Sequence, residues 1–136
     1  IIYKFQVRKL NYIRQEILEE LIKIRNEINP HLVFIPSLND LHQDHYTVAM
    51  EGVRAFKQVS ILGYELPWNN ITFHTQAFIK LKRNHIEKKI ETLQVYKSQS
   101  FRDYATDDFI WSLAKTRGVQ IGTEFAETFE VIRWII

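Results

Sequence analysis

The chain of 136 residues has no cysteine, one methionine, four glycines and three prolines. Without cysteine there is no disulfide framework and no thiolate site, so any metal ion must be bound by His, Asp or Glu. No apolar run approaches the roughly 18 residues that span a bilayer, and no targeting segment is visible, so we expect a cytoplasmic protein without a membrane span. Lys and Arg number 18 against 16 Asp and Glu, without a basic stripe, which argues against nucleic-acid binding.

What the chain does contain is the composition of a folded globular domain. Hydrophobic residues make up 46% and charged residues 25%. The absence of internal repeats and of Pro/Gly-rich linkers predicts one domain over residues 1–136. The chain begins at Ile1 and its single methionine is Met50, which favours the interpretation that it is part of a longer polypeptide.

Hydrophobic periodicity predicts alternating helices and short strands. The expected helices cover 11–29, 41–58 and 84–97, and a fourth begins after Thr106 as N-cap and ends near Gly118. The expected strands cover 32–35, 61–65 and 129–134, with 71–81 also extended. This alternation predicts an α/β fold with a largely parallel sheet. Because ligands of such sheets bind beyond the carboxyl ends of the strands, the loop 37–40 is the expected position of a site.

Two histidines follow that loop, at the expected start of the second helix. His42 and His45 are three residues apart and therefore project toward the same side. Imidazole is the commonest zinc ligand, and Asp44 between them is positioned to orient one ring through its second nitrogen. A catalytic zinc ion usually has three protein ligands. His45 is one candidate, and His42 is either a second ligand or a group that acts on the substrate; a solvated helix cap is the alternative to both.

The segment Phe34–His45, with the sequence FIPSLNDLHQDH, resembles the second signature of the PIG-L/LmbE-like zinc-dependent N-deacetylases. The similarity continues in the same order over nearly the whole chain, in Arg14–Leu18, Tyr64–Trp68, Lys88–Gln99, Arg117-Gly118, Gly122 and Ala126–Phe129. The resemblance implies a Rossmann-like α/β domain flanked by helices, Zn²⁺ as cofactor, and removal of an N-acetyl group from an N-acetylglucosamine-type glycan or glycoside.

The resemblance also implies roles for individual residues. His45 corresponds to the third zinc ligand of the family. His42 matches the histidine that polarises the amide carbonyl or protonates the leaving amine, and Asp44 the carboxylate that supports the histidine chemistry. Asp40 and Glu127 occupy family positions near the site and are candidate substrate contacts.

One part of the family pattern is absent from the 136 residues. The first signature, Ala-His-Pro-Asp-Asp-Glu, carries the other two zinc ligands and the general base, and it does not occur here. We therefore expect a partial deacetylase domain without its amino-terminal βα unit, inactive by itself.

A second interpretation stays open beside the enzyme. The chain would then be a non-catalytic module that kept the fold without the metal site and binds carbohydrate or a protein partner. Aromatic side chains stack on sugar rings, and the candidates for this are Trp68, Trp111, Trp134, Tyr46 and Tyr64.

Overall fold

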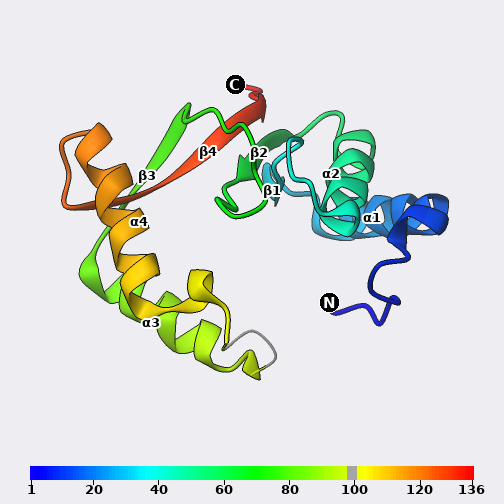
Figure 1. Ribbon diagram of the computed structural model, residues 1–136. Coiled ribbons are helices and arrows are strands. Elements are labelled where there is room, and N and C mark those ends of the chain that lie inside the picture. Colours follow the sequence, from blue (N-terminus) through cyan, green and yellow to red (C-terminus); the bar gives the residue numbers. More distant parts are fainter. Residues whose placement is uncertain (98–100) are drawn as a thin grey trace. The chain divides into compact units, whose positions relative to one another are not determined.

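The computed structural model describes residues 1–97 and 101–136, which form a mixed α/β fold (Figure 1). The helices are α1 (Arg14–Ile28), α2 (Gln43–Ala55), α3 (Arg83–Gln94) and α4 (Asp107–Gln120), with the short 3-10 turns η1 (Leu10–Tyr12) and η3 (Asp103–Ala105). The strands are β1 (Leu32–Pro36), β2 (Ser60–Tyr64), β3 (Ala77–Leu81) and β4 (Phe125–Arg133), paired in the order β1-β2-β4-β3. No helix among these residues has both the length and the apolar character needed to cross a bilayer.

These elements confirm most of the sequence prediction. The four helices and the strands β1, β2 and β4 lie where expected, with ends that differ by a few residues. The strand expected over 71–81 begins only at Ala77. Ser98 and Gln99, which end one of the segments that resemble the deacetylases, lie outside the described residues.

The described residues divide into two compact units, each with its own core. Unit 1 comprises Ile1–Gln76 and Phe129–Ile136, and unit 2 comprises Ala77–Thr128, so β4 contributes to both. The core of unit 1 consists of Leu18, Ile35, Ala49, Ala55, Phe56, Val59 and Ile61. The core of unit 2 consists of Ile86, Ile90, Ile110, Ala114 and Phe125. The single domain expected from the sequence stays a prediction.

The sheet of unit 1 is mixed, where a largely parallel sheet was expected. β1 pairs with β2 in parallel, with Leu32 opposite Ser60 and Pro36 opposite Tyr64. β4 pairs with β2 in the antiparallel direction, so that Gly63 lies opposite Glu130. The carboxyl ends of β1 and β2 therefore lie at the same edge of the sheet, as the prediction of a site after β1 requires.

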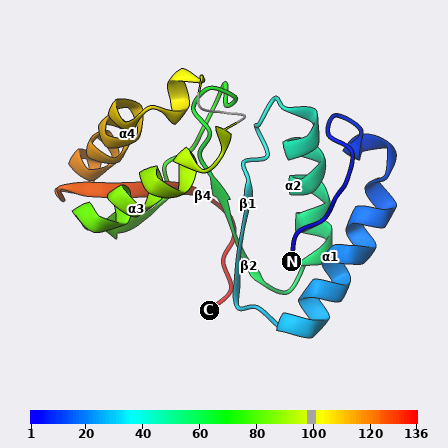
Figure 2. The ribbon, with the colours of Figure 1, turned by 90° about the horizontal axis from the view of Figure 1, so that it is seen from below.

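Helix α2 lies between β1 and α1, and small residues on α2 permit this close packing (Figure 2). Ala49, Gly52 and Ala55 are buried on one face of the helix. A Cβ atom added at Gly52 would lie 3.1 Å from Cγ2 of Ile35, which shows how closely the helix approaches the strand. This packing fixes the amino-terminal end of α2 beside the end of β1.

In unit 2, α4 begins as predicted and ends at Gln120, close to the expected end near Gly118. The Thr106 hydroxyl accepts a hydrogen bond from the Phe109 N–H at 3.4 Å, which confirms the expected N-cap. The helix continues to Gln120, and the residue with a left-handed backbone after it is Gly122, at φ +68°. Gly118 serves packing instead, because an added Cβ would lie 2.7 Å from the carbonyl oxygens of Thr123 and Glu124.

We expect Gly118→Ala to destabilise the protein, although alanine favours helices over glycine by about 1 kcal/mol. The added methyl group meets backbone atoms that cannot rotate away, and overpacking of this kind costs about 1–3 kcal/mol. Chemical denaturation followed by circular dichroism measures the change. Ser112→Ala, at an exposed position of the same helix, is the control and should leave stability nearly unchanged. A stabilised Gly118→Ala variant would contradict the packing role.

Candidate functional site

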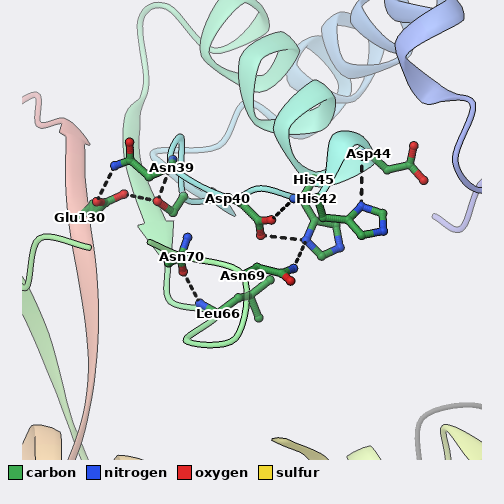
Figure 3. A network of polar contacts seen from close by, with 10 residues as sticks. Asn39, Asp40, His42, Asp44, His45, Leu66, Asn69, Asn70 and Glu130 are labelled. Atoms are coloured by element: carbon green, nitrogen blue, oxygen red, sulfur yellow. Dashed lines mark hydrogen bonds and ion pairs between the residues drawn. The ribbon is translucent and has the colours of Figure 1, made fainter. Parts of the chain in front are cut away.

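The two predicted histidines meet at the amino-terminal end of α2, beside the carboxyl end of β1 (Figure 3). The ring centroids of His42 and His45 are 4.4 Å apart, and the ring planes are inclined by 27°. The residues that contact the two rings, Asp40, Asp44 and Asn69, all belong to unit 1. The structure therefore places the histidines together on one side, at the expected edge of the sheet.

Asp40 connects both histidines through its buried carboxylate. Its Oδ1 accepts a hydrogen bond from the His42 backbone N–H at 2.7 Å, and its Oδ2 lies 2.8 Å from Nδ1 of His45. The Asp40 side chain is 0% exposed, whereas that of His45 is 36% exposed. Because a carboxylate only accepts hydrogen bonds, the proton of His45 lies on Nδ1. The lone pair of Nε2 is then available to bind a metal ion.

His42 has the opposite tautomer. It is the N-cap of α2, and its Nδ1 accepts a hydrogen bond from the Asp44 backbone N–H at 3.2 Å. A backbone N–H can only donate, so the proton of neutral His42 lies on Nε2. The stacked rings thus present one nitrogen that can bind a metal ion and one N–H that can donate to an oxygen of a ligand.

The carboxylate of Asp44 does not orient a histidine ring, and in this respect the expectation from the sequence is corrected; only the Asp44 backbone N–H bonds a ring, that of His42. The carboxylate accepts hydrogen bonds from the backbone N–H groups of Arg8, at 2.5 Å, and Leu10, at 3.3 Å. Figure 3 shows this carboxylate directed away from both rings, toward the amino-terminal segment. The carboxylate that orients the His45 ring is that of Asp40, which the sequence suggested as a substrate contact or as a structural hydrogen-bonding residue of the loop. Whether Asp40 also touches substrate stays a prediction.

The turn after β2 lies against the same loop. Asp40 and Asn70 form an isolated antiparallel bridge, and the Leu41 N–H donates to the Asn69 carbonyl oxygen at 3.2 Å. The side-chain nitrogen of Asn69 lies 3.4 Å from Nδ1 of His45. Asn70 Oδ1 accepts from the Leu66 N–H at 2.7 Å, which closes the turn. The sequence predicted this turn but not its contacts with the histidine loop.

Two further groups lie near the site: Glu130 was not identified from the sequence, and Tyr64 was suggested there only as an aromatic residue that could stack on sugar. Glu130 of β4 is a buried carboxylate bonded to the loop that follows β1. The sequence signal that could have identified Glu130 is its charge within the otherwise largely apolar segment Phe129–Trp134. Tyr64 ends β2, and burial, together with the negative charge of Asp40, raises the pKa of its hydroxyl. The hydroxyl of Tyr64 therefore remains protonated and able to donate over the physiological pH range.

Two of the other candidates, Glu127 and Trp111, lie in unit 2. Glu127 pairs with Lys89 of α3 at 2.5 Å, and its contact with substrate stays a prediction. Trp111, suggested as a sugar platform, packs on Phe125 with ring centroids 5.2 Å apart and has the Arg83 guanidinium 5.0 Å from its ring. Trp111 thus contributes to the core of that unit.

Within residues 1–97 and 101–136, no three His, Asp or Glu side chains are arranged to hold a metal ion together. His45 nevertheless has the chemistry of a zinc ligand, because a carboxylate on Nδ1 is the usual outer partner of a metal-binding histidine. The described residues therefore fit one position of a zinc site.

The fold is shared with solved structures of several proteins, while no family model matches the sequence. The zinc-inhibited form of teicoplanin deacetylase Orf2 has 17% identity and a TM-score of 0.69, over 98% of this chain and 57% of that one. N,N'-diacetylchitobiose deacetylase from Pyrococcus horikoshii has 19% identity and a TM-score of 0.67, over 87% and 51%. The 4-carboxy-2-hydroxymuconate hydratase GalB from Pseudomonas putida has 14% identity and a TM-score of 0.62, over 90% and 60%.

These likenesses confirm the predicted resemblance at the level of the fold. The chain spans between about one half and three fifths of the length of these structures. Deacetylases and a hydratase occur among them, so the fold alone does not decide the reaction. The reaction has to be argued from the site.

Proposed function

We propose that the chain is part of a zinc-dependent N-deacetylase that removes the acetyl group from an N-acetylglucosamine-type glycan or glycoside. The observation that carries the proposal is the pair of contacts to Nδ1 of His45 and of His42 at the start of α2, from which opposite tautomers follow. Asp40 holds the proton of His45 on Nδ1, and the Asp44 N–H holds that of His42 on Nε2. An amide hydrolase with a metal ion requires both groups, one as a ligand and one as a donor.

In this proposal His45 provides one zinc ligand through Nε2. The other two ligands and the general base are assigned to the first signature of the resemblance, which the 136 residues do not contain. When bound, zinc supplies Lewis-acid activation of water and of the acetamide carbonyl. One fold neighbour, teicoplanin deacetylase Orf2, is described in a zinc-inhibited form. This supports metal binding on the fold, and it does not identify the catalytic metal.

His42 would act on the substrate. Its Nε2–H donates to the acetamide oxygen while negative charge develops there, which stabilises the transition state of hydrolysis. The general base would pass the proton that it takes from the attacking water to the departing amine, so that water and the acetamide give acetate and a free amino sugar. Asp40 fixes the two histidines relative to each other, because one of its oxygens binds the His42 backbone N–H and the other binds the His45 ring.

The test is an assay of the native polypeptide in which these residues occur. Incubation with N-acetylglucosamine-containing glycosides should release acetate and primary amine in equal amounts, and a zinc chelator should abolish the release. Retained glycan binding without any acetate release would contradict the enzyme and support the carbohydrate-binding module instead. The exposed Trp68 and Tyr46 would then be the first aromatic residues to replace.

A further inference from the structure

Glu130 is a buried carboxylate that the proposed reaction does not use. It lies on β4 opposite Gly63 of β2 and is 6% exposed. A carboxylate removed from water requires hydrogen-bond donors or a counter-charge. Its bonding partners therefore indicate what it stabilises.

Among the residues that the structure describes, three neutral groups donate to Glu130, and two of them belong to the loop before the histidines. Ser37 Oγ donates to Oε2 at 2.5 Å, and Asn39 Nδ2 donates to Oε1 at 3.3 Å. The third donor is the His74 backbone N–H, at 3.1 Å from Oε1. An O–H donor to a carboxylate at such a distance forms one of the stronger hydrogen bonds in proteins. Glu130 thus ties the loop to a strand in the middle of the sheet.

Ser37 transmits this restraint to Asp40. Its side chain is completely buried, its Oγ also accepts from the Asn39 N–H at 3.1 Å, and its carbonyl oxygen accepts from the Asp40 N–H at 3.2 Å. Asp40 in turn bonds the His45 ring. A continuous series of hydrogen bonds therefore leads from Glu130 through Ser37 and Asp40 to His45. Figure 3 shows its last bond, from Asp40 to His45.

We propose that Glu130 is a positioning residue that holds the loop 37–40 so that Asp40 keeps the proton of His45 on Nδ1. The inference rests on the proposed function only in that His45 is the metal ligand. Glu130 acts through hydrogen-bond geometry: Oε2 accepts from the Ser37 hydroxyl, Oε1 accepts from Asn39 Nδ2 and the His74 N–H, and the loop follows β1 without a regular ladder of its own.

Two replacements separate geometry from charge. Glu130→Gln keeps an oxygen that accepts from Asn39 and His74, and its amide nitrogen can donate to the Ser37 hydroxyl after that hydroxyl rotates. Glu130→Ala removes all three bonds. A positioning role predicts that glutamine rescues the site and that alanine does not.

The primary readout is the tautomer of His45, measured by long-range ¹H–¹⁵N NMR correlation at alkaline pH, where imidazoles are neutral. We expect the Nδ1–H tautomer in the wild type and in Glu130→Gln, and a mixture in Glu130→Ala. Glu51→Gln is the matched control, since it alters a buried carboxylate of the same unit that does not contact the loop. An unchanged tautomer in Glu130→Ala, or equal effects of glutamine and alanine, would overturn the proposal.

The second readout distinguishes this proposal from the proposed function. Zinc titration of the native polypeptide by calorimetry should show weaker affinity in Glu130→Ala, by up to the roughly 10–100-fold that loss of Asp40, the outer partner of His45, would itself cause. If the wild type binds no zinc while the tautomer still responds to Glu130→Ala, the zinc-dependent function fails and the positioning role stands. If zinc binds but neither readout responds, the positioning role fails alone.

Discussion

Replacing both Arg14 and Arg54 by methionine should lower the free energy of unfolding by about 3–5 kcal/mol, the usual cost of leaving a buried charge without a partner. Glu51 of α2 is 0% exposed, and its carboxylate lies between these two arginines. Arg14 Nε donates to Oε1 at 2.6 Å, and Arg54 Nη1 donates to Oε2 at 2.5 Å. The ion pair of Arg14 with Glu51 joins α1 to α2, and the two histidines lie at the start of α2.

Removing the arginines should cost more stability than removing Glu51, and this difference provides a control. The two arginine side chains are 48% and 49% exposed, so they can turn into water when Glu51 is removed. Glu51 cannot do so when the arginines are removed. Adding Glu51→Met to the double variant should therefore recover stability, because methionine fills the space without a charge. Urea denaturation followed by circular dichroism measures each variant, and a triple variant no more stable than the double would refute this account.

Replacing His45 by alanine should reduce the zinc content of the native polypeptide from about one ion to almost none, because a catalytic site usually has three protein ligands. Replacing His42 by alanine should preserve zinc and lower turnover by about 10²–10⁴-fold, the usual contribution of a positioned proton donor. The two histidines thus separate into different phenotypes although their rings are stacked 4.4 Å apart.

Metal analysis and acetate release measure the two effects. His31→Ala is the control, since His31 is exposed just before β1 and should affect neither quantity. Unaltered zinc content in the His45 variant would refute its assignment as a ligand. Loss of zinc in the His42 variant would instead make His42 a second ligand, the alternative that the sequence left open.

Local patterns were sufficient for the elements and for the histidine pair. The spacing of apolar residues in α1 and the prolines at 30 and 36 around β1 act over a few residues, and so does the three-residue interval between His42 and His45. Pairing of strands depends on residues far apart in the chain. For this reason the antiparallel direction of β4 was not predictable from its own pattern.

The sequence also did not determine which of two nearby aspartates, Asp40 or Asp44, bonds the His45 ring. Asp44 is adjacent to His45 in sequence, yet a helix turns about 100° per residue, which directs its side chain to another face, toward Arg8. Asp40 precedes the helix, and its bond to the His42 N–H brings its carboxylate over the first turn, within reach of the His45 ring.

The sequence alone was thus enough for the α/β class and for the position of the histidine pair after β1, because both depend on neighbours along the chain. The folded structure added which carboxylate holds which ring, and the buried Glu130 behind the loop. Ser37 and Glu130 are 93 residues apart and meet only because β4 pairs with β2 beside β1. Hydrogen bonds formed across such a separation carry no local sequence signal.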